Sequence, residues 1–368
     1  MRTRAVDRVE SRAGKQLPIF DEMGSGRLRP AALPLVGEQA DIHYLATTAR
    51  NVLNGPETTG MGFWSVNPYV GCAFGCAYCY ARYTHRHVME RAHGTLPPTV
   101  LADLPPWLAF ERRIVVKQNA PELLRQTLHA MKATRGRERW RRLLAESVVV
   151  GTATDPYQPA ERRFRITRGV LEAIAEHEGM RVTIITKSPL VTRDADLLAR
   201  IAAQGRMTVH VTITTIDREL ARRIEPRAPT PESRLRAVAR LRESGIDVGV
   251  NVMPILPGIT DPPLLLEALV RRIAEAGATH LGACALRLQR AARERYLPFI
   301  ESEFPALAAR YRGAYGRTPQ VNARYREGLR AFVARLCTRY GIRFGYRDPE
   351  EEPPIQDTTP SAQLALGL

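Results

Sequence analysis

Apolar residues in the central part of the chain form short β-branched runs that alternate with longer amphipathic stretches. The runs are typical of buried strands, and the stretches have the spacing of helices. The helical patterns have recognisable ends: one begins at Thr230, with Pro231 in the first turn, and ends at Gly245. The predicted strands are 63–70, 147–153, 181–187, 208–215, 248–256 and 279–286.

A helix between successive strands predicts parallel pairing, because a parallel crossover needs a dozen or more residues. The predicted fold is therefore α/β, with six units that curl into an open, partial (β/α)6 barrel. The loops that follow the strands of such a barrel gather at one mouth. A strand at 111–117 and a helix at 119–131 are expected as an insertion between the first and second units.

The segments that flank this pattern differ from it in composition. Residues 1–60 mix proline, glycine and charge without periodicity and predict an irregular N-terminal arm. The barrel is expected over 61–290 and a helical C-terminal extension over 291–346, with a short strand near 342–346. Residues 347–368 are rich in proline and acid and predict a disordered tail.

The composition argues against two classes, secreted disulfide-rich proteins and membrane-spanning proteins. The 368 residues include five cysteines, too few and too scattered for a secreted disulfide framework, and no apolar run is long enough to span a membrane. The N-terminus lacks the layout of a signal peptide, so we expect a cytoplasmic protein. The formal charge of +16 would attract polyanions, but the basic residues are mostly arginine and are spread along the chain. Charge alone therefore gives weak support for nucleic-acid binding.

Three of the cysteines, Cys72, Cys76 and Cys79, form a C-x-x-x-C-x-x-C motif just after the first predicted strand. Three thiolates can ligate three metal corners, and the lack of a nearby fourth leaves one coordination position open. An open position indicates chemistry rather than a structural role.

The motif, placed in a six-unit β/α series, resembles that of the radical S-adenosylmethionine superfamily. The resemblance extends over about 64–288 and is strongest for the spore photoproduct lyase-like branch, often labelled DNA repair photolyase. It implies a 4Fe-4S cluster on the three cysteines. It also implies that S-adenosylmethionine binds the free iron and is cleaved reductively to a 5'-deoxyadenosyl radical that abstracts hydrogen from substrate. The segments that carry it are NPYVGCAFGCAYCYAR, TDPYQPAE, TKSPLVTRD, VTITTID, EPRAPTPESRL and NVMPILPG.

The resemblance also implies contacts to S-adenosylmethionine. Lys187 would pair with the cofactor carboxylate, with a surface salt bridge as the alternative. The Thr212 hydroxyl would hydrogen-bond the same carboxylate, and the alternative is a threonine that is present for its strand propensity. Asp155 would bind the amino group, with a turn residue before Pro156 as the alternative. Glu225 and Arg234 form either a cofactor contact or an ion pair that braces the loop.

Four further residues are candidates for a role in the radical chemistry. Tyr78 and Tyr80 flank the third cysteine, where the branch has tyrosines in radical relay; the alternative is apolar cover for the cluster. Thr152 stands where spore photoproduct lyase has its hydrogen-donating cysteine, and a hydroxyl is a poor donor to a carbon radical. Cys284 could substitute if it faces the barrel, and is otherwise a buried structural cysteine.

Two further expectations concern the partners of the protein and an alternative class of protein to which it could belong. The resemblance implies a reductant such as flavodoxin or ferredoxin, and nucleic acid is the first substrate expected, with a protein or small molecule as the alternative. The oligomeric state cannot be predicted. In the rival interpretation the cysteines bind zinc together with His85 or His87, and the chain is a non-catalytic nucleic-acid-binding protein.

Overall fold

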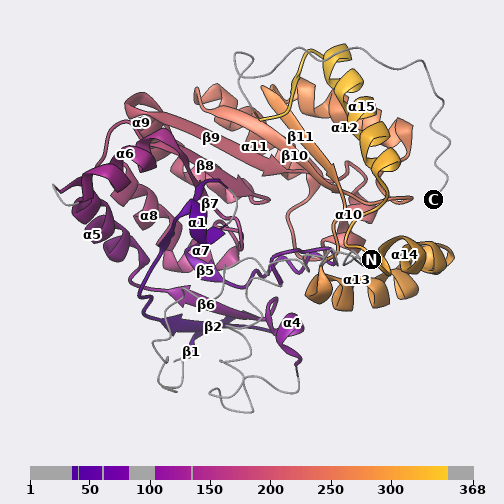
Figure 1. Cartoon of the computed structure of the whole chain (residues 1–368), viewed down its shortest axis with the longest axis horizontal. Helices are drawn as coiled ribbons and strands as arrows, with labels where there is room; N and C mark the ends of the chain where they lie inside the picture. The colour runs from indigo at the N-terminus through magenta and orange to yellow at the C-terminus, as the bar shows by residue number, and fades with distance from the viewer. Residues whose placement is uncertain (1–34, 40, 60–61, 83–103, 134–135, 347–368) are drawn as a thin grey trace, which may run out of the picture.

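The computed structural model describes residues 35–39, 41–59, 62–82, 104–133 and 136–346. Residues 1–34, His85, His87 and the predicted tail at 347–368 lie outside this set. Figure 1 shows a twisted sheet with helices packed along it and a second, smaller sheet below. Within the described residues, no helix is both long and apolar enough to cross a membrane.

The larger sheet has eight strands in the order β12-β11-β10-β9-β8-β7-β4-β3. Neighbouring strands from β4 to β12 are parallel, and β3 pairs with β4 in the antiparallel sense. The strands are β3 (Leu53–Asn54), β4 (Trp64–Val66), β7 (Ser147–Val150), β8 (Arg181–Thr186), β9 (Arg206–Thr212), β10 (Asp247–Ile255), β11 (His280–Ala285) and β12 (Arg343–Phe344). This sequential, parallel, unclosed sheet confirms the predicted α/β partial barrel.

The smaller sheet has the order β1-β2-β6-β5, formed by β1 (Leu35–Gln39), β2 (Ile42–Thr47), β5 (Tyr69–Val70) and β6 (Arg113–Lys117). The strand predicted at 111–117 is therefore present, followed by the predicted helix, but it belongs to this second sheet. The expectation of an irregular arm is wrong for its described part, because β1 to β3 and one helical turn form between residues 35 and 59.

The strand predicted at 63–70 is interrupted. Its first half, β4, lies in the large sheet, and its second half, β5, lies in the small one. Pro68 stands between them and has no N–H to donate to a ladder. The preceding Asn67 instead uses its side chain, donating to the Thr152 hydroxyl at 3.0 Å and accepting from the Ala153 amide at 2.8 Å.

Helices cover one face of the large sheet. In chain order the helices before the C-terminal extension are α1 (Pro56–Thr59), α4 (Pro106–Ala109), which lies beside the small sheet (Figure 1), α5 (Ala120–Lys132), α6 (Arg137–Ala145), α7 (Pro159–Phe164), α8 (Ile166–Ile174), η3 (Pro189–Asp194), α9 (Ala195–Gln204), α10 (Arg218–Ile224), α11 (Pro231–Glu243) and α12 (Pro263–Glu275). The predicted start of the helix at Thr230 is confirmed, since its side chain accepts from the Ser233 amide.

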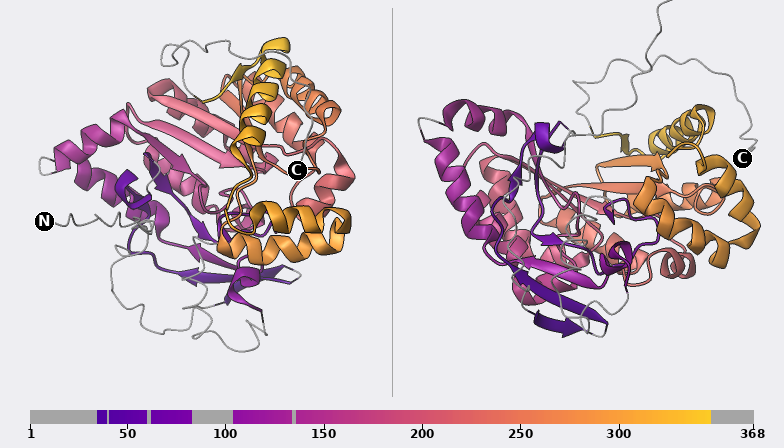
Figure 2. Two further views of the ribbon diagram at one scale, coloured as in Figure 1. Left: turned by 45° about the vertical axis from the view of Figure 1, so that its right-hand side comes forward. Right: turned by 60° about the horizontal axis from the view of Figure 1, so that its bottom comes forward.

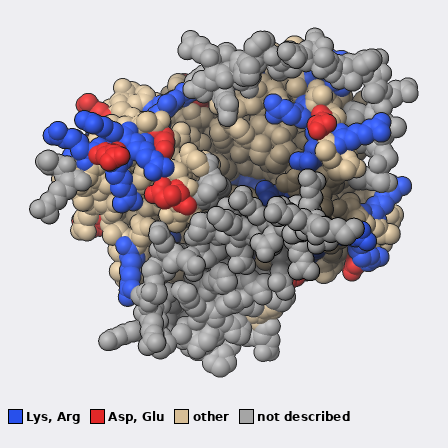
Figure 3. Space-filling model, in the orientation of Figure 1, with Lys and Arg blue, Asp and Glu red and all other residues tan. Residues whose placement is uncertain are grey.

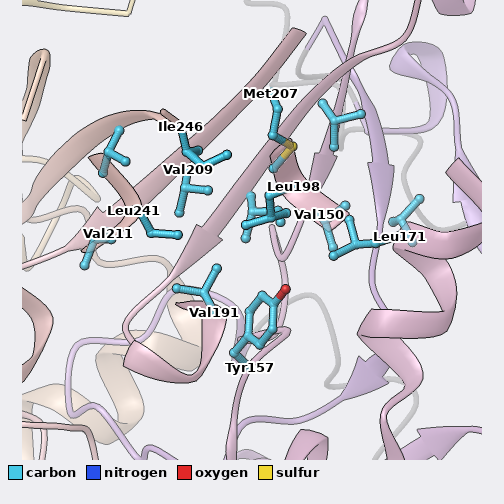
Figure 4. Packing of buried hydrophobic residues seen from close by; sticks show 14 of the residues in the cluster. Val150, Tyr157, Leu171, Val191, Leu198, Met207, Val209, Val211, Leu241 and Ile246 are labelled. Atoms are coloured by element: carbon cyan, nitrogen blue, oxygen red, sulfur yellow. The ribbon is translucent and has the colours of Figure 1, made fainter. Parts of the chain in front are cut away.

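Strand alternation decides which residues meet these helices. On β9, Met207, Val209 and Val211 are buried in the main core, together with side chains from the helices (Figure 4). The residues between them face the other way. The opposite, concave face of the sheet is therefore open to other side chains and to ligands.

The C-terminal extension contains the predicted helices and also completes the sheet. Its elements are α13 (Arg290–Glu303), η4 (Pro305–Leu307), α14 (Ala308–Tyr315) and α15 (Ala323–Arg339), followed by β12, which pairs with β11. Figure 2 shows α13 and α14 side by side in orange. A second core joins this pair to the cysteine segment, burying Tyr296 and Tyr311 in the same cluster as Phe74.

Candidate active site

The three cysteines of the motif lie in the loop that follows β5. All three thiols are free, and all three line one cavity of 740 Å³ on the concave side of the sheet. Two glycines with positive φ, Gly71 and Gly75, shape the loop. Gly71 has φ +86°, and a Cβ there would lie 2.7 Å from the carbonyl oxygen of Phe110, so that only glycine fits.

Residues after β7 hold the cysteine loop in place. The Gln158 side chain accepts from the Ala73 amide at 2.9 Å and donates to the Gly71 carbonyl at 3.1 Å. The Tyr69 hydroxyl donates to the buried Glu161 carboxylate at 2.5 Å. These residues, which follow the second predicted strand, therefore support the loop rather than face the cavity.

The thiols lie in a poorly hydrated environment. Burial raises the pKa of Cys76 to about 12, and it raises the pKa of Cys72 well above its ordinary value. Metal binding requires thiolates, so binding a metal here must release protons. Among the described residues, no group of three or more histidine, cysteine or acidic side chains is arranged around a single metal ion.

The donor set fits the cluster that the motif implies. Three free thiols on one cavity wall can each ligate a separate iron, and nearby cationic groups offset part of the charge of thiolates and cluster. The zinc alternative with His85 or His87 involves residues outside the described set.

Lys187, the residue after β8, is a predicted cation that lies beside this loop. Its Nζ lies 5.5 Å from the centre of the Tyr78 ring, and its side chain lines the cavity. Burial disfavours its charge, but the neighbouring Cys76 and Glu225 raise its pKa overall. The structure therefore brings this charged lysine to the cysteines.

Asp155 also lines the cavity, but its carboxylate is already satisfied by the protein. It accepts from the Thr186 hydroxyl at 2.7 Å, from the Lys187 amide at 2.7 Å and from the Tyr157 amide at 2.9 Å. Burial raises the pKa of Asp155, and these three hydrogen bonds oppose that shift. Asp155 thus orients the end of β8 and the Lys187 backbone.

Glu225 and Arg234 form a buried ion pair behind the cysteine loop. The Tyr78 hydroxyl also donates to Glu225, and Arg234 donates to the Thr212 carbonyl at 3.1 Å. Although burial favours the neutral acid, Arg234 and Lys187 hold the pKa of Glu225 below its usual value. Of the two predicted alternatives for this pair, the structure shows the ion pair, and neither residue lines the cavity.

The remaining predicted residues all line the cavity. Thr212 lies at the end of β9, and Tyr80 donates its hydroxyl to the Thr152 carbonyl. Cys284, on β11, is accessible from the cavity, so the expectation of a cysteine facing the barrel is met and the buried alternative is not. Cys337 is buried in the main core.

A set of polar side chains deeper in the barrel was missed from the sequence. The Nε2 atoms of His210 and His280 lie 2.9 Å apart, and the Tyr346 ring lies 5.0 Å from that of His210. The Tyr346 hydroxyl donates to Asn251 at 2.8 Å. The strict alternation of polar and apolar residues over 206–212 was the signal that could have revealed this face. On the side seen in Figure 3 the surface is hollowed, and the wall of the hollow is mostly uncharged.

Comparisons with known proteins identify the family to which the chain belongs. The family model of the radical SAM superfamily matches residues 66–265. This chain belongs to the radical S-adenosylmethionine superfamily and is a radical S-adenosylmethionine enzyme.

The chain is also similar to individual proteins and to solved structures. An uncharacterised protein of Mycobacterium tuberculosis is 36% identical over 82% of this chain and 84% of its own length. One of Methanocaldococcus jannaschii is 28% identical over 60% and 70%. Among solved structures, spore photoproduct lyase complexed with dinucleoside spore photoproduct has a TM-score of 0.57 at 17% identity, covering 82% of each chain. This last likeness shows a shared fold.

Proposed function

We propose that the chain binds a 4Fe-4S cluster on Cys72, Cys76 and Cys79 and uses it with S-adenosylmethionine to act on nucleic acid. When bound, the cluster and cofactor supply a 5'-deoxyadenosyl radical that abstracts hydrogen from the substrate. The observation that carries the proposal is the shared cavity. Three free thiols and the half-buried cation of Lys187 line the same cavity.

The residues of the chain have separate tasks in this proposal. Lys187 pairs with the cofactor carboxylate, and the Thr212 hydroxyl hydrogen-bonds it. Asp155 fixes the backbone of Lys187 through its hydrogen bond to that amide. Glu225 and Arg234 hold Tyr78 against the cysteine loop, so that water is excluded from one side of the cluster.

Nucleic acid is the proposed substrate for two reasons. The fold is shared with an enzyme solved with S-adenosylmethionine and dinucleoside spore photoproduct, and the chain carries a net charge of +16. A flavodoxin or ferredoxin would supply the electron, and a reducing cytoplasm would keep the thiols free. Because Thr152 is a poor hydrogen donor, we assign any hydrogen return within the cavity to Cys284, with Tyr80 as a relay.

The decisive experiment is anaerobic incubation of the reconstituted, reduced protein with S-adenosylmethionine. We expect 5'-deoxyadenosine to form, and Cys76→Ala to lose both the brown colour and the product. Cys337→Ala is the matched control, since that thiol lies in the core, away from the cavity. An intact cluster that yields no 5'-deoxyadenosine would refute the radical function, and colourless protein containing zinc would favour the rival class.

A further inference from the structure

A basic segment lies in the C-terminal extension. Residues 304–326 contain no aspartate or glutamate and five arginines, which are Arg310, Arg312, Arg317, Arg324 and Arg326. All five are exposed. Arg312 forms an ion pair with Glu301, whereas the other four form none with the residues that the structure describes. Like charges gathered without counter-ions repel one another, so folding alone does not explain this segment.

Two of these arginines lie on opposite sides of a groove. Arg310 of α14 and Arg326 of α15 line a groove of about 810 Å³, which we call the α14–α15 groove. The loop between the helices contributes Thr318, Gln320 and Asn322 to it. Among the described residues that line the groove, none is acidic and none is aromatic. The groove therefore suits an anionic chain held by its charge, and it offers no ring on which a base could stack.

Side chains of α13 and α14 fix the loop that forms one wall of the groove. Arg293 of α13 donates to the Gly316 carbonyl at 3.2 Å and to the Thr318 carbonyl at 3.5 Å. The Tyr315 hydroxyl, at the end of α14, donates to the Leu286 carbonyl at 3.1 Å. Because Leu286 lines the active-site cavity, this hydrogen bond ties the groove to the cavity.

The groove and the active-site cavity are neighbours. Arg287, which lines the cavity, pairs with Gln320 of the groove in an antiparallel bridge, and the Leu288 amide donates to the Pro319 carbonyl at 2.8 Å. Residues paired in this way have Cα atoms about 5 Å apart. One pair of bridged backbones therefore separates the cavity from the groove, and the exposed Arg287 lies at the step between them.

We propose that the α14–α15 groove binds the phosphodiester backbone of a nucleic-acid strand whose reacting nucleotide occupies the cavity. The guanidinium groups of Arg310 and Arg326 contact phosphate oxygens, which arginine recognises well. This assignment rests on the proposed function and extends it beyond the cavity. An acidic protein would also be attracted to the charge, but continuity with the cavity favours the strand, because only the substrate must enter the cavity.

The test measures how affinity depends on strand length and salt. A DNA dinucleotide fills the cavity alone, whereas a single strand of about 12 nucleotides also reaches the groove. Binding of both is measured by calorimetry on the full-length, cluster-loaded protein, with the cluster oxidised and S-adenosylmethionine present. Arg310→Gln with Arg326→Gln should weaken binding of the longer strand about 10- to 100-fold. The slope of log affinity against log salt should fall by about 1.4, since each lost phosphate contact contributes about 0.7.

The same double variant should bind the dinucleotide as the unaltered protein does, because a dinucleotide does not reach the groove. The control removes equal charge elsewhere. Arg222→Gln with Arg236→Gln alters two exposed helical arginines outside the cavity and the groove, and should keep both the affinity for the longer strand and the salt slope. Iron content should be the same in all these proteins.

Three results would overturn the proposal. Equal losses in the two double variants would show diffuse attraction rather than a site, and an unchanged affinity of the groove variant for the longer strand would show that the strand lies elsewhere. If the groove substitutions weakened binding of an acidic flavodoxin but not of the strand, the groove would belong to the reductant.

Failure of this proposal is distinguishable from failure of the proposed function. If the longer strand binds and the groove substitutions change nothing, only the groove assignment is wrong. If the unaltered protein binds no strand, the groove assignment and the nucleic-acid substrate are both wrong. Formation of 5'-deoxyadenosine tests the radical chemistry in either case, and none of the binding measurements depends on it.

Discussion

His210 of β9 and His280 of β11 meet across the strand that separates them, with their Nε2 atoms 2.9 Å apart. Gly249 of β10 is the register partner of both residues. A Cβ on Gly249 would lie 2.1 Å from the Nε2 atom of His280. The absence of a side chain at this one position therefore allows the two rings to make contact inside the barrel.

Replacing this glycine should separate the histidines. We expect Gly249→Ala to lower the free energy of unfolding by about 1–3 kcal/mol, because the added methyl group forces the rings apart. Urea denaturation measures the change. Gly313→Ala is the control: Gly313 lies on α14 with no atom within 4 Å of the added group, so stability should be unchanged or slightly higher. Equal effects at both positions would contradict the steric explanation.

The buried histidine should make stability depend on pH. Burial, followed by the neighbouring His280, lowers the pKa of His210 to about 3, whereas Asp247 acts weakly in the opposite direction. Between pH 6.5 and about 3 the unfolded chain binds a proton that the folded chain does not, so stability falls as pH falls. At pH 5 the loss from this residue is about 2 kcal/mol. His210→Asn should reduce the drop in unfolding free energy between pH 7 and pH 5; an unchanged drop would show that His210 does not titrate in this way.

Glu111 is the shared acid of a buried cluster that braces the cysteine loop. Arg82 contacts it at 2.7 Å and also donates to the Cys76 carbonyl at 3.0 Å, while Arg295 of α13 contacts it at 3.3 Å. Glu111→Gln removes the negative charge that the buried Arg82 guanidinium contacts, so we expect a loss of about 3–5 kcal/mol in the free energy of unfolding and weaker iron retention. Denaturation and iron content measure the two effects.

The matched control for Glu111 is an exposed pair. Glu303 contacts Arg223 at 3.0 Å, with both side chains well exposed. Glu303→Gln should cost at most about 1 kcal/mol and leave the iron content unchanged. A similar loss in both variants would show that burial of Glu111 is not the source of its effect.

Lys187 should matter for the cofactor and not for the cluster. We expect Lys187→Gln to raise the dissociation constant for S-adenosylmethionine about 10- to 100-fold, since it removes a charge-assisted contact to the carboxylate. Iron content should stay at the level of the unaltered protein. Lys132→Gln, on the exposed side of α5, is the control for loss of one positive charge. Equilibrium dialysis of both variants decides whether Lys187 contacts the cofactor.

Much of the barrel could be predicted from the sequence, because its strands are short apolar runs separated by amphipathic helices. The smaller sheet could not, since β2 is buried on both faces and lacks alternation, and β5 continues directly from β4 in the chain. Both sheets depend on long-range pairing that a local pattern does not encode.

Part of the candidate site could likewise be predicted from the sequence, and part depends on long-range packing. The three cysteines are close together in sequence and could be recognised from spacing alone. For Glu225 and Arg234 the sequence permits two roles, because only the packing around them shows that they form an ion pair. His210 and His280 are separated by 70 positions, and their contact depends on the glycine between them.

The strand β12 is made from almost the last described residues, and yet it joins the large sheet beside β11. During synthesis, the wall that carries Tyr346 cannot assemble until these residues have left the ribosome. Every earlier nascent chain presents the concave face with one side missing. Among the described residues, the deep end of the barrel is therefore the last part to take shape, and a prematurely terminated chain would hold its cysteines without it.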